Sequence, residues 1–162
     1  EIESSVKYAS EITGLGSCLS ADPEKLSMGQ RRRLGIASML SMKPSILVLD
    51  EPTIGQDGKN LSRFMRLIRE LNTQGITVLM ISHDIPSVLE YATRIVIMND
   101  GMITADVSPT ELLKNPMMLL ENGLQIPPFV EQLHYLHEKH GVTPQKFTSE
   151  SVANSLTKLV VG

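Results

Sequence analysis

The chain alternates apolar and polar positions with the periods of helices and strands. Residues 1–12 carry apolar side chains at helical spacing, which predicts a helix that ends at Gly14. A second helix is predicted to begin at Ser27, because Gln30 follows at the spacing of a capping box. Lys43-Pro44 is predicted to stop it, since proline cannot continue a helix.

Short apolar runs that follow this helix predict strands. They cover residues 46–49, 76–81 and 94–98. The first run, Ile-Leu-Val-Leu, has no polar position, which is typical of a central parallel strand buried on both faces. Between the strands, an amphipathic helix is predicted at 61–71 and a helix of about two turns at 84–91. Asp100-Gly101 predicts a hairpin that pairs 95–98 with 102–106.

This order of elements predicts the α/β class, with a mostly parallel sheet and an antiparallel edge. Beyond residue 108 the pattern becomes helical. Helices are predicted at 108–121, 129–140 and 149–161, the first two separated by Pro127-Pro128. We therefore expect three parts. They are a helical subdomain over 1–45, part of an α/β core over 46–107, and a helical extension over 108–162.

Composition narrows the class of protein. The 162 residues are 41% hydrophobic and 20% charged, which excludes a disordered chain. The single cysteine, Cys18, excludes an internal disulfide framework and fits a reducing compartment. A net charge of −3 disfavours nucleic acid as a partner, and Arg31–Arg33 is interpreted as a solvated helix face. His134 and His137 share a helical face, but His140 does not, so no complete metal site is expected.

Side chains suited to phosphate chemistry cluster at predicted element ends. Asp50 and Glu51 end a buried strand, where open α/β sheets bind ligands. Neighbouring strand residues point to opposite sides, so one carboxylate can hold hydrated Mg²⁺ while the other activates a water. His83 ends the next strand. The start of the Ser27 helix is an anion site, and Gly29 permits close approach of a phosphate.

The order and spacing of these residues resemble the ATP-binding cassette (ABC) ATPases over roughly residues 1–107. Four motifs carry the resemblance. Leu26–Gln30 resembles the signature motif, Ile46–Glu51 the Walker B motif, Asp57 the D-loop aspartate and His83 the switch histidine. The resemblance implies a partial P-loop NTPase core that binds ATP and Mg²⁺.

The resemblance also implies a role for each residue. Asp50 would bind Mg²⁺ through water, Glu51 would be the general base, and His83 would contact the γ-phosphate. The signature residues Ser27, Gly29 and Gln30 would bind ATP held by a second subunit, and Asp57 would link the two sites. ATP is sandwiched between two subunits in this family, so the chain alone is expected to be inactive.

Two departures from the family pattern stand out. Met28 occupies a signature position that is usually glycine. The Walker A loop, G-x-x-x-x-G-K-[S/T], is also missing. Gly58-Lys59 is followed by Asn60 and lies after the Walker B strand. Because the chain begins at Glu1, within a predicted helix, we expect it to be the C-terminal part of a longer protein.

Two further segments narrow the resemblance to one subgroup of the family. Residues 124–145 and the segment Thr53–Asp57 are similar to energy-coupling-factor ATPases, which drive import of vitamins and metal ions in bacteria and archaea. The implied partners are a second ATPase subunit and transmembrane transporter subunits. These would hold the protein at the cytoplasmic face of the membrane. Two alternatives remain: a non-catalytic half-cassette that serves as a dimerisation module, and the C-terminal lobe of an ABC-type DNA-maintenance ATPase.

Overall fold

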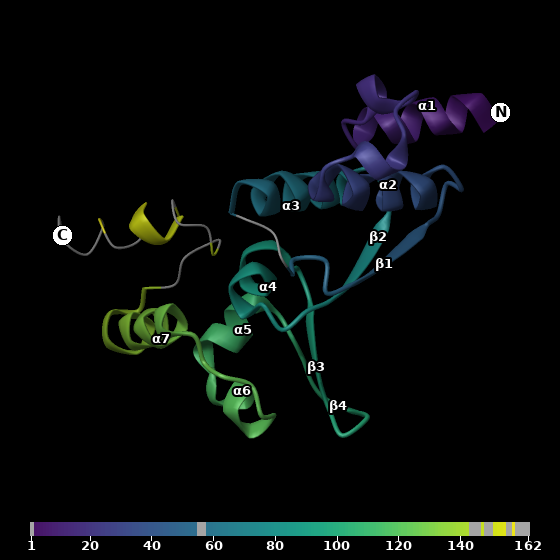
Figure 1. Ribbon diagram of the computed structural model, residues 1–162. Helices are drawn as coiled ribbons and strands as arrows, with labels where there is room; N and C mark the ends of the chain where they lie inside the picture. Colours follow the sequence, from purple (N-terminus) through teal and green to yellow (C-terminus); the bar gives the residue numbers. More distant parts are fainter. Residues whose placement is uncertain (1, 55–57, 143–146, 148–150, 155–156, 158–162) are drawn as a thin grey trace. The chain divides into compact units, whose positions relative to one another are not determined.

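The chain forms two compact units, Glu1–Ser82 and His83–Gly162, in the computed structural model (Figure 1). The structure describes residues 2–54, 58–142, 147, 151–154 and 157. This division differs from the boundaries at 45/46 and 107/108 expected from the sequence. The three-part organisation therefore stays a prediction, and the fold is best described unit by unit.

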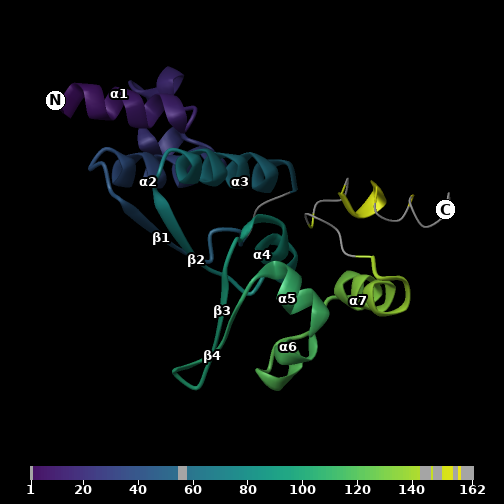
Figure 2. The ribbon, with the colours of Figure 1, turned by 180° about the vertical axis from the view of Figure 1, so that it is seen from behind.

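The first unit places helices over a pair of parallel strands. Its elements are α1 (Ile2–Ile12), α2 (Met28–Leu40), β1 (Ile46–Asp50), α3 (Gly58–Thr73) and β2 (Thr77–Ile81). Helices α2 and α3 lie side by side over one face of the two strands, and α1 lies beyond α2 (Figures 1 and 2). The predicted helices and strands of this region are thus confirmed. The segment between α1 and α2 also contains two short 3-10 turns, Gly16–Cys18 and Pro23–Lys25.

Strands β1 and β2 pair in parallel over their full length, from Ile46 opposite Thr77 to Asp50 opposite Ile81. Only one face of β1 is buried: Leu47 and Leu49 are 2% and 7% exposed. On the other face, Val48 is 53% exposed. The prediction of a strand buried on both faces is therefore wrong. A short apolar run specifies an extended segment, but only the packing of further layers decides how many of its faces are covered.

The amphipathic pattern of α3 is confirmed. Its side chains Phe64, Met65 and Leu71 are buried, whereas the arginines between them are exposed. Gly75 follows the helix with a φ of +94°, a conformation that costs glycine far less than other residues. Helix α3 can therefore turn back directly into β2.

The second unit begins with a capped helix and a hairpin. Its elements are α4 (Ile85–Tyr91), β3 (Ile95–Asn99), β4 (Met102–Val107), α5 (Pro109–Lys114), α6 (Met117–Glu121) and α7 (Pro128–His140). The hairpin forms as predicted, with positive φ angles of 49° at Asp100 and 75° at Gly101. The described strands make two two-stranded sheets, β1–β2 and β3–β4, rather than one. The turn signal at Asp100-Gly101 predicted correctly that β3 pairs with β4, but the sequence did not indicate that this hairpin would form a sheet of its own.

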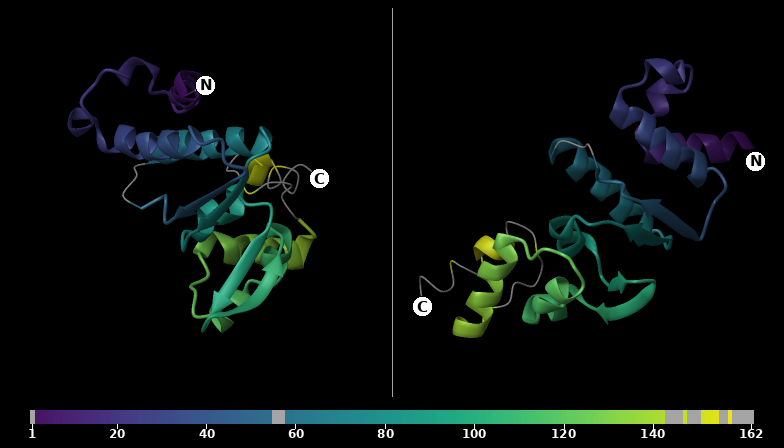
Figure 3. Two further views of the ribbon diagram at one scale, coloured as in Figure 1. Left: turned by 90° about the vertical axis from the view of Figure 1, so that its right-hand side faces the viewer. Right: turned by 60° about the horizontal axis from the view of Figure 1, so that its bottom comes forward.

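One hydrophobic core joins the hairpin to the C-terminal helices. Ile95 and Ile97 from β3 cluster with Leu112 and Leu113 from α5, and with Val130 from α7. Figure 3 shows the green helices packed behind the teal hairpin. The helical extension and the hairpin are therefore stabilised by the same buried side chains.

The helix predicted over 108–121 is instead two helices, α5 and α6. The break falls at Asn115-Pro116, where Asn115 has the non-helical angles φ −133° and ψ 72°. Pro116 lacks an amide proton, and its ring disfavours the helical conformation of the preceding residue. Of the helix predicted over 149–161, the described residues 151–154 and 157 are helical.

We expect the buried cluster to set the stability of the second unit. Leu119 is 1% exposed and Leu120 is 50% exposed, so the two form a matched pair. Leu119→Ala should lower the free energy of unfolding by about 2–5 kcal/mol, because it leaves a cavity. Leu120→Ala should change it by less than about 0.5 kcal/mol. Urea denaturation of both variants provides the measurement, and equal midpoints would contradict the assignment of this core.

The ion pair across the hairpin predicts a pH effect. Arg94 donates two hydrogen bonds to Asp106, at 2.8 Å from Nε and 2.6 Å from Nη2, and these lower the pKa of the Asp106 carboxyl. Stability from this pair should be fully present above the ordinary aspartate pKa and should be lost as the pH falls through the lowered value. NMR titration of Asp106 should show the lowered pKa in the native chain and an ordinary one in Arg94→Gln. An identical pKa in both would contradict the pairing.

Candidate functional site

The start of α2 is held by the predicted capping box. The amide of Gln30 donates to Ser27 Oγ at 3.3 Å, and the amide of Ser27 donates to Gln30 Oε1 at 2.9 Å. The first bond along the helix runs from the amide of Arg31 to the Ser27 carbonyl at 2.8 Å. The amides of Met28 and Gly29 lie before that bond, in the turn where helix N–H groups lack intrahelical acceptors. This geometry suits an anion.

The glutamine of this box has a second contact. Gln30 Nε2 donates to Cys18 Sγ at 3.5 Å, which ties the side chain to the 3-10 turn Gly16–Cys18. The sequence predicted the contact of Gln30 with Ser27, because three residues separate them. It gave no sign of the contact with Cys18, which depends on how the intervening loop folds back.

Gly29 is not required by packing within the chain. A Cβ at this position would meet Asn60 Oδ1 at 3.8 Å and Arg33 Nη1 at 3.9 Å, both ordinary van der Waals distances. A small residue here therefore leaves space for a group that approaches from outside the chain. The neighbouring Met28 is 73% exposed, so its side chain extends into solvent at the same helix start.

The two carboxylates at the end of β1 differ in environment. Asp50 is the last strand residue and is exposed, on the same face as Val48. Glu51 is half-buried, and its Oε2 atom is shielded from solvent. Its amide donates to the Ile81 carbonyl at 2.9 Å, so the turn begins against the end of β2. Asp50 is thus open to an ion, and Glu51 is sheltered.

Glu51 also has an unusual backbone. Its φ is +43°, a left-handed conformation that costs a residue with a side chain on the order of 1–3 kcal/mol and is found mostly where surrounding structure imposes it. The turn that follows buries Pro52 and Thr53. This abrupt change of direction moves Glu51 out of the alternation of β1, so the two carboxylates need not share a function.

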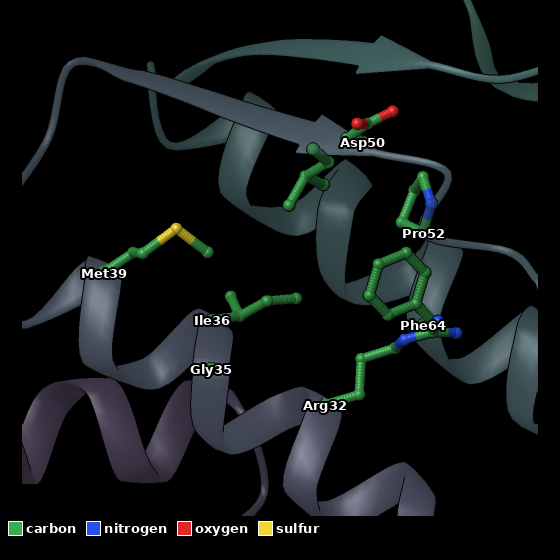
Figure 4. A pocket seen from close by; sticks show the side chains of 8 residues that line it. Arg32, Gly35, Ile36, Met39, Asp50, Pro52 and Phe64 are labelled. Atoms are coloured by element: carbon green, nitrogen blue, oxygen red, sulfur yellow. The ribbon is translucent and has the colours of Figure 1, made fainter.

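A cavity of about 170 Å³ lies between α2, α3 and this turn (Figure 4). Ile36 and Phe64 project into it from the two helices, and Asp50 and Pro52 border it at the strand end. Arg32 also borders it, and its Nη1 atom donates to the Ile54 carbonyl at 3.1 Å. The cavity therefore lies directly beside the carboxylate turn.

The arginine triplet is not one solvated face, contrary to the sequence-based interpretation. Arg31 is exposed, but Arg32 and Arg33 are half-buried, and Arg33 Nε is shielded from solvent. Consecutive helix residues are rotated by about 100°, so three in a row cannot all face the same way. Helical geometry alone was therefore a signal that part of this triplet faces the protein.

Other expected site residues lie elsewhere. His83 belongs to the second unit, where its side chain is exposed and its carbonyl accepts the Ile85 amide at 3.0 Å. Asp57 lies outside the described residues. The structure thus brings Ser27, Gly29, Gln30, Asp50 and Glu51 into one unit, and it does not fix the distance from His83 to the carboxylates.

The donor set fits Mg²⁺ better than a transition metal. Among the described residues, no three His, Cys, Asp or Glu side chains gather as a metal cluster. His134 instead places Nδ1 at 3.0 Å from the Leu113 carbonyl, between α7 and α5. Mg²⁺ needs only one or two carboxylates when water and phosphate complete its shell. The exposed Asp50 carboxylate fits that requirement.

Comparison with known proteins matches residues 4–54 to the family model of the ABC transporter. The chain is 32% identical to an energy-coupling factor transporter ATP-binding protein, EcfA, of Methanothermobacter thermautotrophicus, over all 162 residues and 52% of that protein. Among solved structures, cbiO1 of Clostridium perfringens, part of the ABC transporter complex cbiONQ, is 30% identical. The structural match to cbiO1 has a TM-score of 0.66 and covers 80% of this chain and 52% of the cbiO1 chain. The ADP form of the ATP-binding cassette MJ1267 gives a TM-score of 0.66 at 27% identity, covering 83% of this chain and 50% of its own.

The curated relatives that the chain matches are longer, and it spans 21% to 52% of their length. The structural matches extend over most of the chain and support the α/β, P-loop NTPase class. Within the described residues, every helix is too short or too polar to cross a lipid bilayer.

The capping box predicts a specific stability pattern on α2. Ser27→Ala should lower the free energy of unfolding by about 1 kcal/mol, because it removes the acceptor for the Gln30 amide. Gln30→Glu should keep stability within about 0.5 kcal/mol, since glutamate also completes a capping box. Thermal unfolding of the chain provides the measurement.

Ser38→Ala is the matched control on the same helix. The Ser38 hydroxyl donates to the Leu34 carbonyl at 2.9 Å, within the helix and away from its start. Alanine is the better helix former, so this variant should be as stable as the native chain or more so. If Ser27→Ala and Ser38→Ala lowered the free energy of unfolding equally, the cap would contribute no more than a serine in the middle of the helix.

Proposed function

Because the chain belongs to the family of ABC transporter ATP-binding proteins, we propose that it is the C-terminal part of an importer ATPase that couples ATP hydrolysis to uptake of a small molecule. The observation that carries this proposal is the pairing of an exposed Asp50 with a sheltered Glu51 at the end of a parallel strand. The match to EcfA over the whole chain supports the energy-coupling-factor subgroup, and hence a vitamin or a metal ion as cargo.

Each carboxylate has a distinct role in this proposal. Asp50 would hold Mg²⁺ through water, and the ion when bound would neutralise charge on the phosphate oxygens. Glu51 would accept the proton of the attacking water, aided by its partial burial. His83 would contact the γ-phosphate and polarise the attacking water.

The helix start would act on a different nucleotide. Ser27, Gly29 and Gln30 would contact the γ-phosphate of ATP bound to a second ATPase subunit, using the helix amides and the small profile of Gly29. Asp57 would connect the two sites. The phosphate-binding loop would come from outside this chain, so the chain alone would not hydrolyse ATP.

The proposed partners follow from the same arrangement. A second ATPase subunit would complete each site, and transmembrane transporter subunits would hold the pair peripherally at the cytoplasmic face of a bacterial or archaeal membrane. EcfA is described as a transporter component, and cbiO1 as part of a transporter complex. These relatives favour the importer over a DNA-maintenance ATPase.

Glu51→Gln tests the general base in the full-length protein that carries this chain. We expect kcat for ATP hydrolysis to fall by roughly 100-fold or more, because the amide cannot accept the proton. ATP binding should persist, since the substitution preserves shape. Steady-state hydrolysis and equilibrium nucleotide binding provide the two measurements.

Glu70→Gln is the control for this experiment, because Glu70 is exposed on α3. It should leave kcat unchanged. Normal turnover in Glu51→Gln would remove Glu51 from the catalytic step. Absence of hydrolysis in the unmodified full-length protein would instead favour the non-catalytic dimerisation module.

His83→Ala should also lose turnover of ATP in the full-length protein, and a normal rate of hydrolysis would assign His83 a structural role.

A further inference from the structure

Arg32 lies between the two parts of the candidate site. It belongs to the first turns of α2, two residues after Gln30, and its side chain is half-buried. Its Nη1 atom donates to the Ile54 carbonyl at 3.1 Å, across 22 residues of sequence. A hydrogen bond thus joins the helix that begins with the capping box to the turn that begins with Glu51.

That turn needs external support. Glu51 has a left-handed φ of +43°, which residues with side chains adopt mostly under structural constraint. Its amide bonds to Ile81 at 2.9 Å, which fixes the turn to β2. The Ile54 amide reaches the Glu51 carbonyl at 3.4 Å, a long and therefore weak closing bond. The bond from Arg32 to Ile54 holds the far end of the same turn.

The surroundings favour a fixed guanidinium. Arg32 lines the cavity of about 170 Å³ together with Asp50 and Phe64, so its stem lies along a partly apolar wall (Figure 4). A charged donor makes a stronger hydrogen bond to a carbonyl than a neutral one does. Long arginine stems also contribute packing, so the side chain is held by more than its terminal group.

We propose that Arg32 is a positioning residue that couples the helix start of α2 to the conformation of the Glu51 turn. The inference rests on the proposed function, in which these two elements of one chain serve two different nucleotides. A displacement of α2 on binding one nucleotide would move the guanidinium, and through Ile54 would change how firmly Glu51 is held for hydrolysis of the other. Arg32 itself touches neither nucleotide in this arrangement.

Three variants of the full-length protein test this role. Arg32→Met keeps an apolar stem along the cavity but removes the donor, and Arg32→Lys keeps a cation and a donor. Arg69→Met is the matched control, since Arg69 is exposed on α3. For each variant, kcat and KM for ATP are measured together with hydrogen exchange of the backbone amides of Glu51, Thr53 and Ile54.

We expect Arg32→Met to lower kcat by roughly 2- to 30-fold with KM unchanged, because coupling residues of this kind act on that scale. Exchange of the Ile54 amide should become faster. Arg32→Lys should recover most of both properties, and Arg69→Met should match the native protein. If Arg32 had only a structural role, its substitution would lower the thermal stability without lowering kcat at an unchanged KM.

Native kcat and native exchange in Arg32→Met would overturn the proposal, as would a raised KM with normal kcat. If Arg32→Met does not fold, the Arg32→Lys variant tests the proposal in its place. A folded Lys variant with native protection at Ile54 and most of the native kcat supports positioning through the donor, and one that has lost both overturns it. Failure here is distinguishable from failure of the proposed function, because Glu51→Gln tests the base independently of Arg32.

Discussion

The parallel pairing of β1 and β2 determines where the candidate chemistry lies. The strands are in register to their last residues, with Asp50 opposite Ile81. The next amide, from Glu51, bonds to the Ile81 carbonyl and redirects the chain. Asp50 and Glu51 are adjacent in the sequence, and this pairing fixes the edge of the sheet at which the exposed and the sheltered carboxylate lie. Movement of either strand by one residue would reverse which side chain faces the helices.

The helices above the strands connect this edge to the anion site. Helices α2 and α3 bury Leu47 and Leu49 beneath them, which leaves Val48 and Leu79 on an exposed apolar face. The same helix that covers β1 begins with the capping box of Ser27, and it carries Arg32, which bonds to the turn after Glu51. Core packing and site geometry in the first unit therefore depend on the same helix.

In the second unit, hydrophobic packing joins segments that differ in sequence character. The α4 helix, the β3–β4 hairpin and the C-terminal helices share one buried cluster, which includes Leu89, Ile97 and Leu119. This cluster crosses the boundary at 107/108 that the change of pattern predicted. The hairpin has apolar side chains to bury on one face, and α5 to α7 supply the surface that covers them. The extension is thus part of the unit that contains His83.

The sequence by itself determined what depends on neighbouring residues: most of the helices, the strands, the capping box at Ser27 and Gln30, and the turn at Asp100-Gly101. These features form because bonded groups are three or four residues apart or because one backbone conformation is required. The motif order likewise indicated the family. Tertiary structure alone decided the exposed face of β1, the division of the described strands into two sheets and the bond from Arg32 to Ile54. Those features join residues far apart in the chain, so they depend on how whole elements pack, which local periodicity does not encode.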